Sequence, residues 1–176
     1  MRYAAILVAA ALAGQPALAL AQAQQAPCIT PQQASSLAGY ALPSVISGTT
    51  KRCDSSLSSK SFLKTNGSAL AERYAARKAA TWPEARAAFL AMSKGKDDAS
   101  KIFSQLPDSS LREMVDVVLE GMITQEIPLG ECSKIDNFVR LLAPLPPENT
   151  AELVALLVSM GTANKVKPGK LAVCKG

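Results

Sequence analysis

Residues 109–126, SSLREMVDVVLEGMITQE, carry the longest periodic pattern in the chain. Apolar residues recur there at spacings of three and four, which is the period of an amphipathic helix. The stripe consists of Leu111, Met114, Val115, Val118, Leu119 and Met122. A stripe of this length needs a surface to cover it, so the pattern predicts a long helix whose apolar side faces a core.

Helical patterns also fill the rest of the chain. Thr30 followed by Pro31 and Gln33 forms a capping box with proline at the first helical position, and Thr81 to Glu84 forms a second capping box. Shorter helices are expected over residues 31–42, 55–64, 68–80, 81–95, 98–105, 135–142 and 153–161. No segment alternates polar and apolar residues with β-branched enrichment. The sequence therefore predicts an all-α fold, a compact bundle of about seven or eight short helices.

The N-terminus has the pattern of a secretory signal peptide. Arg2 gives a positive start, residues 4–13 are apolar, and Ala19-Leu20-Ala21 is a small-residue cleavage site. The apolar run is about half of the ~20 residues that span a bilayer, which disfavours a retained membrane anchor. We expect a signal peptide over 1–21 cleaved after Ala21, a disordered mature N-terminus over 22–27, and one helical domain over 28–176.

Four cysteines, Cys28, Cys53, Cys132 and Cys174, follow the signal peptide. Export to an oxidising compartment predicts two disulfides, and four cysteines allow three pairings. Pairing of sequence neighbours, Cys28 with Cys53 and Cys132 with Cys174, is the expected arrangement. The cysteines form no C-x-x-C motif and the chain has no histidine, so neither a metal site nor a cofactor is predicted.

Charge is polarised along the chain. Residues 28–106 hold 11 basic and 5 acidic residues, residues 107–162 hold 3 basic and 9 acidic, and the tail from residue 163 holds four lysines and no acid. The two halves can attract each other within one folded body, or a basic face or tail can bind an anionic partner. Lys165, Lys167 and Lys170, in the extended tail over 162–176, are the candidate contacts for a lipid phosphate, a wall polymer or an acidic protein. Export and the 5% aromatic content disfavour nucleic acid.

Catalytic residues are difficult to assemble from this sequence. Without histidine the commonest general base is missing. Carboxylates offer one alternative, a small cell-wall hydrolase, for which the candidates are Glu113, Asp116 and Glu120 on one helix face and Glu126 and Glu131 beside the following loop. A solvated acidic face explains the same residues. The sequence therefore favours a non-catalytic exported binding or protein-interaction protein.

One resemblance rests on spaced cysteines, prolines and aromatic residues. The markers are Cys28, Leu42-Pro43, Cys53, Arg73-Tyr74, Trp82-Pro83, Cys132, Ile135-Asp136, the LAPLPP run of residues 142–147 and Cys174. In this order they resemble a loose group of small exported alphaproteobacterial proteins. The resemblance implies an exported helical body, and it assigns no activity and no site residues.

Overall fold

The computed structural model describes residues 28–93, 97–163 and 172–174. These residues form seven α-helices, which confirms the all-α prediction. The helices are α1 (Pro31–Cys53), α2 (Phe62–Ala75), α3 (Lys78–Ser93), α4 (Asp97–Gln105), α5 (Asp108–Glu126), α6 (Cys132–Leu142) and α7 (Pro147–Ala163). Two 3-10 turns, η1 (Asp54–Ser56) and η2 (Leu129–Glu131), precede α2 and α6. No helix within these ranges is long and apolar enough to cross a membrane.

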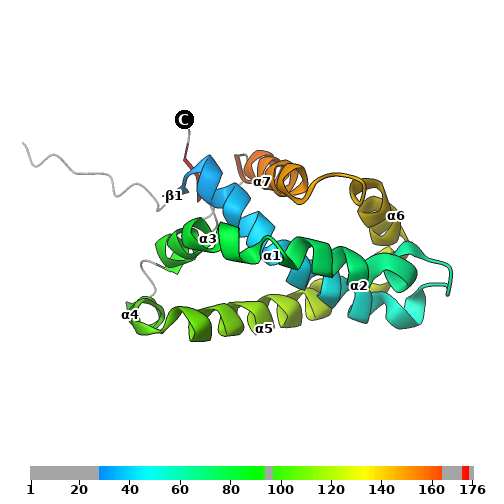
Figure 1. Ribbon diagram of the computed structural model, residues 1–176, viewed down its shortest axis with the longest axis horizontal. Helices are drawn as coiled ribbons and strands as arrows, with labels where there is room; N and C mark the ends of the chain where they lie inside the picture. Colours follow the sequence, from blue (N-terminus) through cyan, green and yellow to red (C-terminus); the bar gives the residue numbers. More distant parts are fainter. Residues whose placement is uncertain (1–27, 94–96, 164–171, 175–176) are drawn as a thin grey trace, which may run out of the picture.

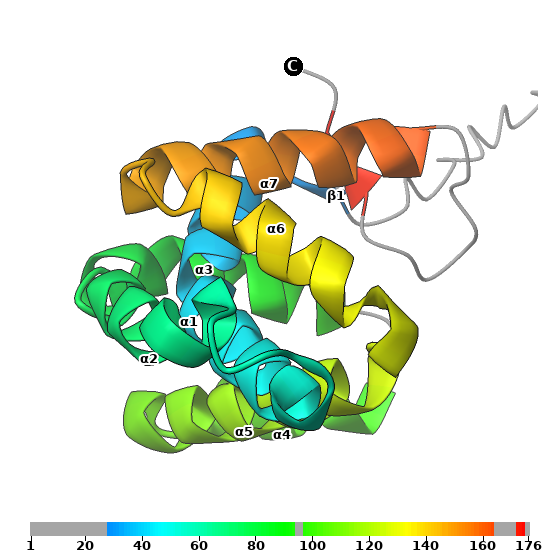
Figure 2. The same ribbon diagram turned by 90° about the vertical axis from the view of Figure 1, so that its right-hand side faces the viewer.

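Helix α1 is the central element, and α2, α3, α5 and α7 all pack against it. Helices α7 and α5 lie on opposite sides of α1 in both views (Figures 1 and 2). Glycines on α1 permit this close packing. A Cβ at Gly48 would lie 3.0 Å from the carbonyl oxygen of Glu120 in α5, and a Cβ at Gly39 would lie 3.4 Å from Ala151 of α7.

The core consists of three apolar clusters, each containing residues of α1. Tyr40 stacks at a tilt on Trp82 of α3, with ring centroids 4.9 Å apart, and both contact the cluster that includes Leu111 and Val115 of α5. A second cluster joins α1 to α2 and α7, and a third joins the start of α1 to α3. The N-terminal part of the predicted α5 stripe is therefore buried as expected.

The predicted end of the first helix at Leu42 is wrong. The Thr30 capping box and Pro31 begin α1 as predicted, but the helix continues through Pro43 to Cys53. Proline at position 43 removes one backbone hydrogen bond. Burial of Leu42 and Ile46 against α2 and α7 offsets this loss, so tertiary packing keeps the chain helical beyond the proline.

The boundaries predicted for the next helices are also wrong. Residues 57–61 are not helical, and α2 begins at Phe62 because a carboxylate of α6 caps it. Asn66-Gly67 does not end a helix, since Gly67 lies inside α2 at a close contact with Thr50. Thr81 does not begin one either: α3 starts at Lys78, and the Thr81 hydroxyl donates back to the Lys78 carbonyl at 3.1 Å. Helices α4 and α5 match the predicted segments to within one residue, whereas α6 and α7 begin three and six residues before the predicted starts at 135 and 153.

The predicted disulfide pairing is wrong as well. Cys28 pairs with Cys174 and Cys53 pairs with Cys132, with Cα atoms 5.1 and 5.5 Å apart. Cys28 and Cys53 flank opposite ends of the 23-residue α1, which is about 34 Å long, so they cannot meet. The Cys28–Cys174 bond accompanies a short parallel pair of strands, β1 (Cys28–Ile29) and β2 (Ala172–Val173). All four cysteines are bonded, as the sequence predicted.

Candidate functional site

Four ion pairs connect basic residues of the N-terminal half with acidic residues of the C-terminal half. They are Lys51–Glu120, Arg77–Glu148, Lys78–Asp116 and Arg86–Asp108. The opposite charges of the two halves thus attract each other between helices of one folded body. This agrees with the first interpretation of the charge distribution, attraction within the fold. The predicted contact lysines, Lys165, Lys167 and Lys170, lie outside the described residues, as does the predicted signal peptide over 1–21.

Three of the five candidate carboxylates, Asp116, Glu120 and Glu131, are engaged in ion pairs. Asp116 is paired with Lys78 and Glu120 with Lys51, both across helix interfaces. Glu131 is paired with Lys134 one turn along α6, at 3.0 Å. In the described part of the chain no group of three or more acidic, cysteine or histidine side chains is placed to hold a metal ion.

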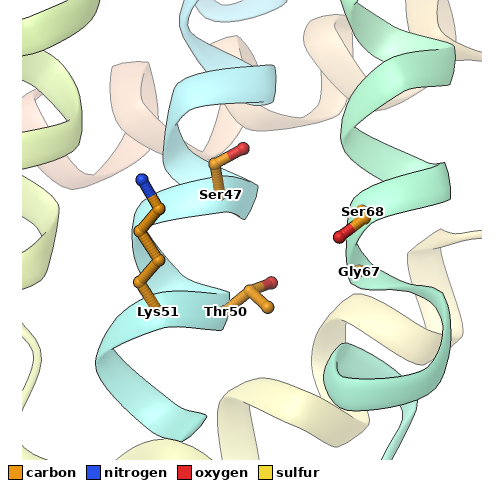
Figure 3. Close-up of a pocket in the computed structure, with 5 residues that line it drawn as sticks. All are labelled: Ser47, Thr50, Lys51, Gly67 and Ser68. Carbon is orange, nitrogen blue, oxygen red and sulfur yellow. The ribbon is translucent and has the colours of Figure 1, made fainter.

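A small pocket lies between α1 and α2 (Figure 3). It has a volume of about 100 Å³ and is lined by Ser47, Thr50, Lys51, Gly67 and Ser68. The Thr50 hydroxyl is buried and accepts no hydrogen bond from the described residues, while the Lys51 ammonium is paired with Glu120 on the side away from α2. The lining contains hydroxyl groups and no carboxylate. This pocket can accommodate a few water molecules.

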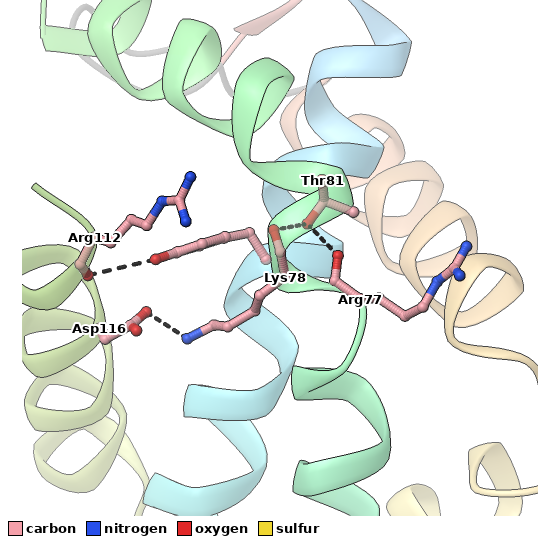
Figure 4. A network of polar contacts seen from close by, with 6 residues as sticks. Arg77, Lys78, Thr81, Arg112 and Asp116 are labelled. Carbon is pink, nitrogen blue, oxygen red and sulfur yellow. Dashed lines mark hydrogen bonds and ion pairs between the residues drawn. The ribbon is translucent and has the colours of Figure 1, made fainter. Parts of the chain in front are cut away.

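A polar cluster joins Lys78 of α3 to Asp116 of α5 (Figure 4), and the buried side chain of Tyr40 in α1 contacts this cluster. The Tyr40 hydroxyl donates to the Arg112 carbonyl at 3.4 Å, and the Lys78 ammonium lies 4.7 Å from the centre of the Tyr40 ring. Lys78 also forms the ion pair with Asp116 at 2.6 Å. Burial, and next the charge of Asp116, raise the pKa of Tyr40 well above its ordinary value. Tyr40 is therefore neutral at physiological pH and serves packing.

Large apolar side chains are exposed on several helices, and nine of them lie on α5, α6 and α7. They are Val117, Val118 and Met122 on α5, Phe138 and Leu141 on α6, and Leu156, Leu157, Val158 and Met160 on α7. Val118 and Met122 were expected in the core, but they are 50% and 56% exposed. Trp82 of α3 covers Leu111 and Val115, and α3 begins only at Lys78, beside Asp116. The C-terminal half of the α5 stripe therefore extends past the helix that covers its N-terminal half.

The exposed residues of α7 are the part that sequence reasoning missed. The sequence predicts that Leu157 and Met160 belong to a helix, and a signal for an uncovered apolar face is also present: the stretch from Leu153 to Ala163 contains no charged residue. A helix that is apolar all round is usually covered on all sides. In this structure one side of α7 packs on α1 and the other side remains exposed. Comparison of the chain with family models, with curated proteins and with solved structures found no match.

Proposed function

We propose that this protein is an exported, non-catalytic helical binding protein whose partner is an anionic component of the cell envelope. The two disulfides indicate an oxidising environment outside the cytoplasm. The signal-peptide pattern over 1–21 supports export to the periplasm or beyond. N-terminal sequencing of the secreted protein tests this part, and we expect the mature chain to begin at Gln22. A chain that keeps Met1 and remains in the cytoplasm contradicts it.

The ion pairs between the two halves carry the argument for the binding surface. These ion pairs engage Lys51, Arg77, Lys78 and Arg86, so these four basic side chains contribute to contacts within the fold. The strongest unopposed charge in the sequence is then the tail, which has four lysines and no acidic residue. Lys165, Lys167 and Lys170 are the proposed contacts with phosphate or carboxylate groups of the partner.

The test is binding of the mature chain to isolated envelope fractions, with and without the tail charges. Lys165→Gln, Lys167→Gln and Lys170→Gln are combined in one variant. A matched variant with Lys60→Gln, Lys101→Gln and Arg140→Gln removes the same charge from exposed sites on the body. We expect the tail variant to bind weakly, the body variant to bind normally, and salt to weaken binding because exposed charges are screened beyond about 8 Å at physiological ionic strength. Binding that responds neither to the tail variant nor to salt contradicts the proposal.

A further inference from the structure

Helix α7 has two apolar faces on opposite sides. The inner face consists of Ala151, Val154 and Ala155, which pack into the core clusters beside α1. At 100° per residue, Leu153, Leu156, Leu157 and Met160 fall on the opposite side of the helix. We call these four residues the outer face of α7. Leu156, Leu157 and Met160 are 55%, 48% and 61% exposed and Leu153 is half-buried, so most of this face is uncovered in the described part of the molecule.

The distribution of charge indicates what the outer face meets. Helix α5 carries five acidic residues and one arginine, and it lies on the side of α1 away from α7 (Figures 1 and 2). The outer face of α7 has no charged residue, and the sequence that follows α7 holds four lysines. Two carboxylates of α7, Glu148 and Glu152, fall between its inner and outer faces at 100° per residue, and Glu148 is paired with Arg77. An uncharged helix face that is followed by lysines, with the acidic helix α5 on the far side of α1, is complementary to a surface that is apolar inside and anionic outside.

The size of the outer face argues against a protein partner. Stable protein interfaces involve about 20–30 residues on each side. The outer face offers four side chains on one convex helix, which is too little for a dimer of this chain but suits insertion among lipid headgroups. No described helix is long and apolar enough to cross the membrane, so the contact would be one of a helix lying flat.

We propose that the outer face of α7 docks on the surface of an anionic lipid bilayer. This inference rests on the proposed function, since it names lipid as the anionic component of the envelope. The axis of α7 lies parallel to the membrane plane, and Leu153, Leu156, Leu157 and Met160 enter the boundary between headgroups and acyl chains. The acidic helix α5 then faces away from the bilayer.

Vesicle flotation with the mature chain tests the proposal. The probes are phosphatidylcholine vesicles with 30% phosphatidylglycerol, phosphatidylcholine vesicles alone, and a soluble anionic polymer, dextran sulfate. Leu156→Ser and Met160→Ser are combined to make the outer face polar. The matched control combines Ile102→Ser and Val117→Ser, which are 57% and 67% exposed on α4 and α5. Circular dichroism establishes that each variant is folded.

We expect the parent and the control to float with the anionic vesicles, and the α7 variant to bind at least tenfold more weakly. Pure phosphatidylcholine should bind the parent weakly. A second reporter is Met160→Trp, whose emission should shift to the blue with anionic vesicles and be quenched by brominated lipid. The native Trp82 is only 2% exposed and should not respond.

The outcomes separate this inference from the proposed function. If the α7 variant binds anionic vesicles as the parent does while the tail variant loses binding, the inference is wrong and the proposed function stands. If the parent binds dextran sulfate but no vesicle, the partner is an anionic polymer and the inference is wrong. If sedimentation shows a parental dimer that the α7 variant dissociates, without vesicle binding, the outer face is an interface between copies and the inference is again wrong. If the parent binds none of these probes, both proposals lose their support.

Discussion

The carboxylate of Asp136 in α6 accepts a hydrogen bond of 2.7 Å from the backbone N–H of Leu63 in the first turn of α2. It also accepts one from Phe62 at 3.3 Å. Helix N-termini have unpaired N–H groups, which the preceding side chain usually satisfies. Here Ser61 makes no such bond. A buried carboxylate from a distant helix therefore caps α2, and the negative charge also suits the positive end of the helix dipole.

This cap predicts a specific loss of stability. We expect Asp136→Ala to lower the free energy of unfolding by about 2 kcal/mol, because two N–H groups lose their acceptor in a largely buried place. Asp136→Asn keeps an acceptor oxygen and should cost about 1 kcal/mol. Urea denaturation measures both. Asp54→Ala, which removes an exposed partner of Lys64, is the control and should change stability by less than about 1 kcal/mol. Equal losses for Asp54→Ala and Asp136→Ala would show that the cap contributes nothing.

Because α1 and α2 are in close contact at Gly67, we expect replacement of this glycine by alanine to destabilise the protein, whereas the same replacement usually stabilises a helix. A Cβ at Gly67 would lie 2.5 Å from the hydroxyl oxygen of Thr50. Gly121 in α5 has nothing within 4 Å of the corresponding position. Replacing a helical glycine by alanine stabilises by about 1 kcal/mol where there is room.

We therefore expect Gly121→Ala to raise the free energy of unfolding by about 0.5–1 kcal/mol and Gly67→Ala to lower it by about 1 kcal/mol or more. Combining Gly67→Ala with Thr50→Ala should restore part of the loss, because the clashing hydroxyl is removed. Thermal unfolding of the three variants measures this. Stabilisation by Gly67→Ala alone would mean that the helices can move apart without cost.

The two disulfides are expected to differ in their contribution to stability. Cys53 and Cys132 are fully buried and tie the end of α1 to the start of α6 across 79 positions. Replacing both by alanine should cost about 4 kcal/mol, from lost loop constraint and lost packing. Replacing Cys28 and Cys174 should lower the free energy of unfolding by less, although the Cys28–Cys174 disulfide closes the longer loop. The reason is that this disulfide joins two-residue strands, which can separate while the helices remain folded. Denaturant titrations of the two double variants compare them, and a larger loss for the Cys28 and Cys174 variant contradicts this prediction.

Tyr40 should make stability depend on alkaline pH. Burial and the carboxylate of Asp116 raise the pKa of Tyr40 above its ordinary value of 10.0. Above pH 10 the unfolded chain loses the phenolic proton while the folded chain keeps it, so this contribution is complete below pH 10 and declines as pH rises further. The difference in unfolding free energy between the parent and Tyr40→Phe should therefore change between pH 8 and pH 11, by up to about 1.4 kcal/mol per pH unit. A difference that is constant over this range would contradict the raised pKa.

The sequence predicted those elements whose signals are local. The apolar period over 109–126 marks α5, and Thr30 with Pro31 and Gln33 marks the start of α1, because a cap involves residues three positions apart. The signals failed where distant residues decide the outcome. Pro43 was expected to end a helix that packing extends, and Gly67 was expected to end a helix whose neighbour requires a glycine.

The start of α2, the disulfide pairing and the exposure of apolar side chains depend still more on tertiary structure. The start of α2 is set by Asp136, which lies more than seventy positions further along the chain. Disulfide partners could not be chosen from spacing because the length of α1 decides which cysteines can meet. The same holds for the surface: Val118 and Leu111 belong to one sequence stripe, yet only Leu111 lies under α3. The candidate contact lysines stay a prediction.

The Cys53–Cys132 disulfide lies within the loop that the Cys28–Cys174 disulfide closes, and this nested order affects how the chain matures. Ribosomes release the N-terminus first, so Cys28 and Cys53 meet an oxidant before Cys132 and Cys174 arrive. Joining consecutive cysteines at that stage gives a pair that the folded protein does not contain. Once α1 forms, its length of about 34 Å lies between these two cysteines, so rapid helix formation protects against the wrong bond. Where oxidation is faster than helix formation, thiol–disulfide exchange must rearrange the pairs, and we expect a disulfide isomerase to increase the yield of this protein.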